Sequence, residues 1–436
     1  MADRQLNVFI NEHLVGTLRE ANDLWAFDYD PAWAASENAF DLSPALSRSR
    51  LLHVDGASQR PVQWYFDNLL PEEALRTVLA REASINEDDS FGLLAYFGAE
   101  SAGSLVLRSP EDPVTVQAGL RELPDAVLSD RIKKLPRLSL NHDAPKRMSL
   151  AGAQHKLAIV FRDGKLFEPL PGEASTHILK PNSQDESYPA TAINEYFVMR
   201  LAKALGLAVP DAHRYYTPEP VYIVDRFDRN TEGKQVLRRH MIDACQLLNK
   251  ARGFKYKAAT LETLSQVIRL CRGRLTARLR LFQWLVFNVL VGNGDNHLKN
   301  ISFIVTREGF EISPGYDLLS TAVYSTRAIA GERAIWPRVE LALPLPGASR
   351  FGDVSRRVML DTGLALGLRQ RTIVRELDRI VTRIIPAAGA LYDNIEKENK
   401  LRPEETKPVL AGELHLLRTI QHLIIREMVR NLEPGA

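Results

Sequence analysis

The spacing of apolar residues separates a first part of the chain that favours strands from a last part that favours helices. Leu6 to Ile10 is mostly apolar and β-prone, and after a polar turn the pattern resumes from Leu14 to Leu18, which predicts an opening β-hairpin. Helical segments follow over residues 72–80 and 91–97, and a strand over 104–107. The first third is therefore predicted to be a small α+β subdomain without a catalytic constellation.

Strand and helix patterns alternate in the middle of the chain. Residues 157–161 and 176–180 read as strands, Asn194 to Leu205 as an amphipathic helix with Glu195 in its first turn, and 221–224 as a further strand. From about residue 240 onward helical spacing prevails, over 261–269, 276–291, 374–385 and 413–432. This order predicts a β-rich lobe, a short hinge and a helical lobe.

The segment from Ser109 to Arg147 is rich in proline and charge and is expected to be a solvated connection between domains. Its basic residues include Arg131, Lys133, Lys134, Arg137, Lys146 and Arg147. Together these patterns place an N-terminal α+β subdomain and linker at 1–139, a β-rich nucleotide-binding lobe at 140–228 and a helical catalytic lobe at 229–436.

Amino-acid composition excludes few classes of protein. A chain of 436 residues with 45% apolar content can bury the cores of two or three globular domains, and a formal charge of +2 neither favours nor excludes a nucleic-acid partner. An arginine cluster could meet a DNA backbone or a nucleic-acid-associated substrate, although a solvated face is the favoured interpretation. Its members are Arg269, Arg272, Arg274, Arg278 and Arg280.

Cys245 and Cys271 lack metal-ligand spacing and are expected to be buried small hydrophobes in a reducing compartment. No apolar run reaches membrane length, and the sequence opens directly on a strand pattern. The predicted localisation is cytoplasmic.

The candidate chemistry centres on the stretch from Gly292 to Asn300, which lies between an apolar helix and a short strand. Asp295 could orient an attacking hydroxyl, and oxygens of Asn300 and the downstream Asp317 could hold magnesium, as phosphoryl transfer requires. An Asp followed five residues later by Asn is common, so this spacing alone is a weak signal.

Upstream residues strengthen the kinase interpretation. A glycine-containing hairpin at 148–156 can bring backbone amides close to an anion, Lys180 can neutralise phosphates at the end of a strand, and Glu195 can hold that lysine. Each has a plainer alternative: an ordinary hairpin bend, a surface lysine, and a first-turn acid stabilised by the helix dipole. The series nevertheless follows the layout of a protein-kinase core, although the Gly-x-Gly-x-x-Gly, His-Arg-Asp and Asp-Phe-Gly signatures are missing.

In these motifs the chain resembles the HipA-type serine/threonine kinase toxins over essentially its whole length. The resemblance is carried by Phe66-Asp-Asn-Leu-Leu-Pro71, Ser149-Leu-Ala-Gly-Ala-Gln-His-Lys156, Thr176-His-Ile-Leu-Lys180, Asn194-Glu-Tyr196, Arg226-Phe-Asp-Arg229, Gly294-Asp-Asn-His-Leu-Lys-Asn300 and Tyr316-Asp317. It implies an α+β fold: a two-lobed kinase core with an additional N-terminal α+β subdomain and a mostly helical C-terminal lobe.

The same resemblance implies roles for individual residues. Asp295 matches the catalytic base, Asn300 and Asp317 the magnesium ligands, and Glu195 the support of Lys180. Asp225, Arg226 and Phe227 match the hinge that reads adenine, with Asp225 standing where the best-known pattern has a glutamate. The remaining residues expected to contact ATP are Ala151, Gly152, Ala153, Gln154, His155, Lys156, Lys180, His297, Leu298, Lys299, Asn300, Tyr316 and Asp317.

Ser149 matches a serine that is autophosphorylated in this family, after which its loop leaves the nucleotide site. A phosphate beside an ATP-phosphate site is repelled unless it finds a basic partner, and Lys146 and Arg147 are close in sequence. A structural serine in a hairpin is the plainer alternative.

The resemblance implies an ATP- and Mg²⁺-dependent protein kinase that acts as the toxin of a toxin–antitoxin pair. The expected substrate is an aminoacyl-tRNA synthetase, glutamyl-tRNA synthetase in the best-known relatives, and the expected partner is a DNA-binding antitoxin, with operator DNA contacted through that complex. Two alternatives stay open: a protein that serves chiefly as a co-repressor, and a kinase of small molecules.

Overall fold

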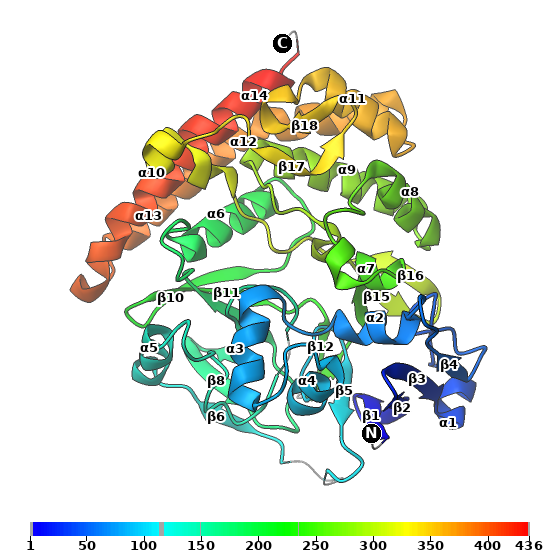
Figure 1. Ribbon diagram of the computed structural model, residues 1–436. Coiled ribbons are helices and arrows are strands. Elements are labelled where there is room, and N and C mark those ends of the chain that lie inside the picture. The colour runs from blue at the N-terminus through cyan, green and yellow to red at the C-terminus, as the bar shows by residue number, and fades with distance from the viewer. Residues whose placement is uncertain (1–2, 113–116, 149, 234, 435–436) are drawn as a thin grey trace. The chain divides into compact units, whose positions relative to one another are not determined.

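The computed structural model describes residues 3–112, 117–148, 150–233 and 235–434. The chain forms two compact units (Figure 1). Unit 1 contains Met1–Lys180, Asp225–Phe254 and Ser302–Ser313, and unit 2 contains Pro181–Val224, Lys255–Ile301 and Pro314–Ala436. Within the described residues, none of the helices combines the length and apolarity that crossing a membrane requires.

Unit 1 begins with a five-stranded antiparallel sheet in the order β4-β3-β2-β1-β5. Its strands are β1 (Arg4–Ile10), β2 (His13–Ala21), β3 (Leu24–Tyr29), β4 (Leu52–Val54) and β5 (Leu105–Arg108), so the predicted opening hairpin is confirmed. Leu6, Val8 and Ile10 alternate along β1 and are all buried, because successive side chains of a strand point to opposite faces. The helices are α1 (Pro31–Ala35), α2 (Pro61–Asp67), α3 (Glu73–Ala83) and α4 (Ser90–Phe97).

A second antiparallel array in unit 1 pairs β9 with β7, β7 with β8 and β8 with β6. These are β6 (Leu120–Glu122), β7 (Leu157–Arg162), β8 (Lys165–Pro169) and β9 (His177–Pro181). Later segments add the hairpin of β12 (Arg229–Glu232) and β13 (Gln235–Arg238), then α7 (Ala244–Leu247) and a three-stranded sheet of β14 (Met241–Asp243), β15 (Ser302–Thr306) and β16 (Gly309–Ile312).

The segment from 109 to 147, expected to be a solvated linker, is solvated only in part: Lys133, Lys134, Arg137 and Arg147 are exposed, but Arg131 and Lys146 are buried. It contributes β6 and α5 (Asp125–Lys133) to unit 1. Arg131 is buried, and its guanidinium lies 2.6 Å from a carboxylate oxygen of the buried Glu168. Composition suggested solvent because it cannot reveal that a charged side chain will meet an opposite charge from a distant strand.

Unit 2 is mostly helical (Figure 1). Its main helices are α6 (Thr191–Ala204), α8 (Leu261–Leu270), α9 (Arg274–Val291), α11 (Arg356–Ala365), α12 (Gln370–Asn399), α13 (Lys407–Thr419) and α14 (Arg426–Leu432), the last two joined by a π-helical turn at Ile420–Ile425. Helix α12 packs on α6, α9 and α13. Shorter elements are β10 (Ala212–Tyr216), β11 (Pro220–Asp225), α10 (Arg327–Ala330), β17 (Glu340–Leu345) and β18 (Ala348–Arg350).

The start of α6 and the end of α12 are among the helix boundaries that differ from the predicted ones. Helix α6 begins at Thr191, so Glu195 lies beyond its first turn, and the helix-dipole explanation of that residue fails. The N–H of Ala192 donates to the side chain of Asn182, a cap that helix periodicity cannot reveal. Helix α12, expected to end at Ile385, continues through Pro386 to Asn399, because its packing on α6, α9, α11 and α13 outweighs one lost backbone hydrogen bond.

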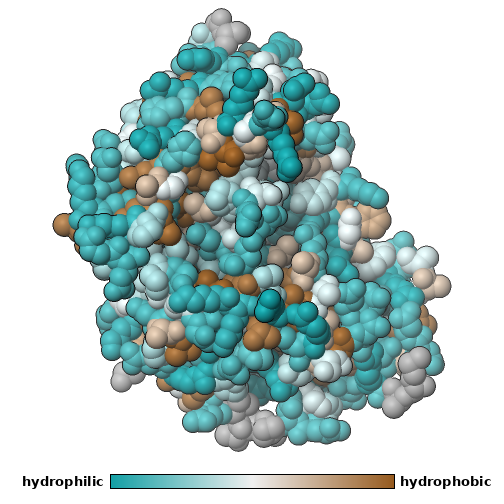
Figure 2. Space-filling view, turned by 60° about the vertical axis from the view of Figure 1, so that its left-hand side comes forward, coloured by the Kyte–Doolittle hydropathy of each residue, from teal (hydrophilic) through white to brown (hydrophobic). Residues whose placement is uncertain are grey.

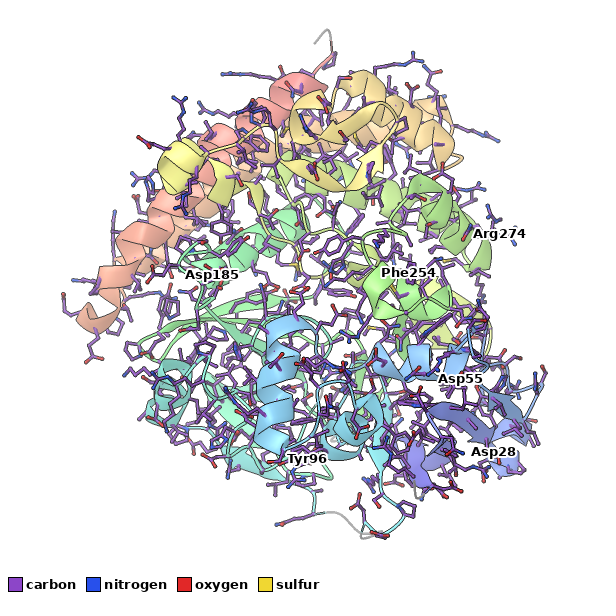
Figure 3. The ribbon with its side chains drawn as sticks, in the orientation of Figure 1. Asp28, Asp55, Tyr96, Asp185, Phe254 and Arg274 are labelled. Atoms are coloured by element: carbon purple, nitrogen blue, oxygen red, sulfur yellow. The ribbon has the colours of Figure 1, made fainter. Side chains whose placement is uncertain are left out.

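The visible surface is mainly hydrophilic, with scattered hydrophobic residues (Figure 2). Arg274 projects outward at the start of α9 (Figure 3) and is exposed, in agreement with the solvated interpretation of that residue. Cys245 and Cys271 are both buried free thiols.

Candidate active site

The candidate catalytic loop begins where α9 ends. Gly292 caps the buried, apolar C-terminal half of this helix in the left-handed conformation, with φ of +66°. A Cβ at Gly292 would lie 2.8 Å from a methyl carbon of Ile424 and 2.9 Å from Cβ of Ala322. Both the backbone conformation and the close packing therefore require glycine. The chain turns sharply here and carries Asp295 away from the end of a rigid helix.

Hydrogen bonds within unit 2 fix the backbone around Asp295. Its N–H donates to Oδ1 of Asn293 at 3.0 Å, and its carbonyl accepts from Nδ2 of Asn300 at 2.7 Å. The N–H of Gly294 donates to Oγ1 of Thr321 at 2.6 Å. The loop is thus held before any ligand binds, which is the preorganisation that catalysis favours.

The carboxylate of Asp295 lies among groups that change its pKa. Tyr256 donates a hydrogen bond to Oδ1 at 2.5 Å, and Nε2 of His297 lies 3.8 Å from the same oxygen. The pKa of Asp295 is raised, chiefly because the surrounding protein partly removes water from its carboxylate. The side chain is still 45% exposed. His297 and Tyr256 oppose that rise in the pKa of Asp295, whereas the negative charge of Asp317 adds to it.

Asp317 is held in an uncommon backbone conformation, with φ of +57°. The surrounding segment is tied to neighbouring elements: the N–H of Gly315 donates to the carbonyl of Ala208 at 2.7 Å, and the hydroxyl of Tyr316 donates to the carbonyl of Lys299 at 2.8 Å. A left-handed residue that is not glycine persists only where its surroundings impose it, and such residues gather at functional sites.

Asn194 on α6 secures the chain just beyond Asp317. Its side-chain amide donates to the carbonyl of Ser320 at 2.9 Å and accepts from the N–H of the same residue at 2.8 Å. It also donates to the hydroxyl of Tyr324 at 3.0 Å. Sequence motifs included Asn194 without giving it a role, and its support of the Asp317 segment emerges only from the structure.

The oxygen donors in unit 2 suit a hard divalent cation. Because Nδ2 of Asn300 is bonded to the loop, its carbonyl oxygen is the end of the amide that can face a ligand. Asp317 supplies a carboxylate nearby. Magnesium prefers oxygen ligands of this kind and is usually held by one or two protein carboxylates plus substrate phosphates. The residues therefore fit the predicted metal.

Unit 1 carries the predicted nucleotide loop from Ala151 to Lys156. Gly152 has φ of +108°, and its carbonyl accepts from the N–H of Glu72 at 3.2 Å, so the N-terminal subdomain anchors the loop. Nζ of Lys156 donates to the carbonyl of Ala151 at 2.7 Å and closes it. Ala153 and Gln154 lie exposed in the turn, and burial lowers the pKa of His155.

The predicted hinge residues also lie in unit 1. The N–H of Arg226 donates to the carbonyl of Thr176 at 2.9 Å, and its buried guanidinium bonds Asp228 and Glu100. Of the polar groups of Arg226, its backbone carbonyl therefore remains for a ligand. Nε2 of His177 lies 3.2 Å from a carboxylate oxygen of Asp225.

Glu100, completely buried, is the centre of a charged cluster in unit 1 that the sequence did not predict. Its carboxylate lies within 3.2 Å of four cations, Lys146, Arg226, Arg229 and Arg238. These positive charges hold the pKa of Glu100 well below its usual range despite burial. Ser149 lies outside the described residues, but Lys146, one of its expected basic partners, belongs to this cluster, and Arg147 stacks 3.9 Å from the ring of Tyr96.

The structure groups some predicted residues and leaves others separate. Asp295, His297, Leu298, Lys299, Asn300, Tyr316 and Asp317 belong to unit 2 and form one connected loop system. The loop 151–156, Lys180 and the hinge residues belong to unit 1, whereas Glu195 belongs to unit 2. Lys180 and Glu195 are both buried, and their pairing stays a prediction. Tyr256 was missed because it lies in no motif and bonds Asp295 across 39 positions of sequence.

Known proteins resemble this chain over most of its length. Residues 148–387 match the model of the HipA-like C-terminal domain and residues 6–108 that of the HipA N-terminal domain. A Sinorhizobium fredii protein, "Putative kinase Y4mE", is 35% identical over 96% of this chain and 99% of its own length. The serine/threonine-protein kinase toxin HipA of Shewanella oneidensis is 31% identical over 73% of this chain and 76% of its own.

The fold has a solved counterpart. HipA of Shewanella oneidensis MR-1, in a structure with HipB and its operator DNA, covers 98% of this chain and 100% of its own, with a TM-score of 0.75 and 26% identity. These relatives and the shared fold identify the chain as a serine/threonine-protein kinase, and the predicted α+β kinase-like fold is confirmed. Within that class, the chain belongs to the HipA family.

Proposed function

We propose that this kinase uses ATP and Mg²⁺ to phosphorylate serine or threonine in a protein, and that it acts as the toxin of a toxin–antitoxin pair. The observation that carries the proposal is the preorganised loop of Asp295 and Asn300 in unit 2, to which the segment of Asp317 is tied by the hydrogen bond from Tyr316 to Lys299. The relative most informative for this role, from Shewanella oneidensis, is named a serine/threonine-protein kinase toxin.

Each residue has a distinct task in the proposed reaction. Asp295 accepts the proton of the attacking hydroxyl and orients its oxygen toward the γ-phosphate. Oxygens of Asn300 and Asp317 would hold magnesium, which neutralises the phosphate charge. In unit 1, Lys180 and the backbone of the loop from Ala151 to Lys156 are proposed to bind the phosphates, and the backbone around Asp225 and Phe227 to bind adenine.

The substrate class follows from the family resemblance. We propose an aminoacyl-tRNA synthetase, glutamyl-tRNA synthetase first, as the protein whose phosphorylation stops translation. We also propose Ser149 as the site of autophosphorylation. Incubation of the full chain with Mg·ATP, followed by mass spectrometry, should find phosphate on Ser149, and an unmodified Ser149 in protein whose activity has declined would contradict this.

Asp295→Asn tests the catalytic role, since it removes the base while preserving shape. We expect transfer of phosphate from labelled ATP to fall at least ~100-fold, a typical contribution of a general base. Asp185→Asn is the matched control, because Asp185 is an exposed acid of the same unit (Figure 3). Equal activity of wild type and Asp295→Asn would contradict the proposal.

A second function, co-repression, is favoured by the solved relative, which was crystallised with HipB and operator DNA. We propose that this chain also binds a DNA-binding antitoxin and reaches operator DNA through that complex. The two functions separate experimentally, because Asp295→Asn should abolish phosphoryl transfer but leave antitoxin binding and the operator complex intact.

A further inference from the structure

Tyr256 lies in the segment that precedes α8 and belongs to no recognised motif. Its hydroxyl donates a hydrogen bond of 2.5 Å to Oδ1 of Asp295. A hydrogen bond from a hydroxyl to an ionised carboxylate is about twice as strong as one between neutral groups. The tyrosine therefore acts directly on the proposed base.

The ring of Tyr256 is held by the same loop that carries Asp295. Its centroid lies 4.8 Å from that of His297, at an interplanar angle of 81°, and Nζ of Lys255 lies 5.3 Å from its centroid. The N–H of Leu298 donates to the carbonyl of Lys255 at 3.2 Å. Contacts to the ring and to the adjacent backbone thus limit how far the hydroxyl can move away from Asp295.

Tyr256 and His297 both approach one oxygen of the carboxylate. The hydroxyl bonds Oδ1, and Nε2 of His297 lies 3.8 Å from that atom. Among the described residues, none donates a hydrogen bond to Oδ2. A general base needs one oxygen within hydrogen-bond reach of the proton it removes, and a carboxylate that is fixed on one side presents the other side in a defined direction.

We infer that Tyr256 is a positioning residue of the kinase: its hydroxyl fixes Oδ1 of Asp295 so that Oδ2 faces the hydroxyl of the protein substrate. This inference rests on the proposed function, since it gives Asp295 the role of base. It adds a residue outside the catalytic loop to the machinery that orients the acceptor. Because Tyr256 already fixes the rotamer of Asp295, less conformational entropy is lost when the substrate hydroxyl binds.

Tyr256→Phe removes only the hydroxyl and keeps the ring that packs on His297. With the full chain and Mg·ATP, we expect kcat for incorporation of phosphate into the chain to fall at least ~10-fold, while KM for ATP changes less than ~2-fold. Tyr256 is 45% exposed, so folding should be unaffected, and an unchanged melting temperature checks this. The control is Tyr392→Phe on α12, which should leave kcat unchanged.

A double-mutant cycle separates positioning from a structural effect. If Tyr256 acts through Asp295, Tyr256→Phe should cause no further loss in an Asp295→Asn background, whereas independent effects would multiply. A wild-type or increased kcat in Tyr256→Phe would overturn the inference. So would losses of kcat that multiply in the double variant, or phosphate found on Tyr256 itself. Full activity of Asp295→Asn would instead overturn the proposed function on which the inference rests.

Discussion

His240 shows how burial determines the chemistry of a single residue in unit 1. Its Nε2 lies 3.2 Å from the carbonyl of Leu42, its Nδ1 lies 3.0 Å from Oγ of Ser104, and its ring stacks on Phe40. These contacts fit a neutral imidazole that donates from Nε2 and accepts at Nδ1. Burial lowers the pKa of His240 to about 4.

This pKa predicts that acid will destabilise the protein through His240. The unfolded state, with an ordinary histidine pKa of about 6.5, takes up a proton first as pH falls, so folding stability decreases between about pH 6.5 and 4 and the effect levels off below that. The expected loss is on the order of 3 kcal/mol. Unfolding free energies measured across this range should depend less on pH in His240→Gln than in wild type.

The exposed His13 supplies the control for this measurement. His13→Gln should retain the full wild-type dependence on pH. Parallel pH curves for wild type and His240→Gln would show that other groups cause the acid sensitivity.

At the scale of elements, the Glu100 cluster joins segments that are distant in sequence. Glu100 follows α4, Lys146 precedes β7, Arg226 and Arg229 flank the start of β12, and Arg238 ends β13. A buried ion cluster stabilises a fold only when every charge has partners, and removal of one member leaves the others unpaired in a dry interior. The packing of these elements against one another therefore depends on the carboxylate of Glu100.

Glu100→Gln tests that dependence by removing the charge at nearly constant volume. We expect a loss of about 3 to 5 kcal/mol in the free energy of unfolding, the cost of breaking a buried pair. Glu122 pairs with Lys165 at 3.2 Å, but both side chains are more than half exposed. Glu122→Gln should therefore cost less than about 1 kcal/mol in the same denaturant titration, and equal losses would contradict the argument.

At the scale of the whole molecule, ligand binding and folding are linked. A ligand that binds only the folded chain stabilises it by about 2.7 kcal/mol when its concentration is 100 times Kd. Mg·ATP should therefore raise the melting temperature of the protein. Asp317→Asn should reduce the part of this increase that requires Mg²⁺, because an amide binds the cation more weakly than a carboxylate.

Asp317→Asn should not disturb the backbone, because asparagine tolerates the left-handed conformation that Asp317 adopts. Without ligand, Asp317→Asn should melt near the wild-type temperature, and Asp185→Asn should respond to Mg·ATP as wild type does. An undiminished Mg²⁺-dependent increase in Asp317→Asn would remove Asp317 from the proposed metal site.

The sequence by itself determined the main helices and strands and the order of the candidate catalytic residues along the chain. Apolar alternation predicted the hairpin of β1 and β2, three-and-four spacing predicted α8 and α9, and the Asp-x-x-x-x-Asn spacing singled out Asp295 and Asn300. These signals are local: each depends on residues within a few turns or one strand, so the backbone periods of 3.6 and 2 suffice to read them.

Only the tertiary structure decided which distant residues meet. At the start of α6 the side chain of Asn182 accepts a hydrogen bond from the N–H of Ala192. Arg131 and Lys146 are buried because Glu168 and Glu100 receive their charges, and Tyr256 reaches Asp295 from outside every motif. The physical reason is the same in each case. Desolvating a polar group is costly without a partner, and that partner is supplied by folding rather than by neighbours in sequence.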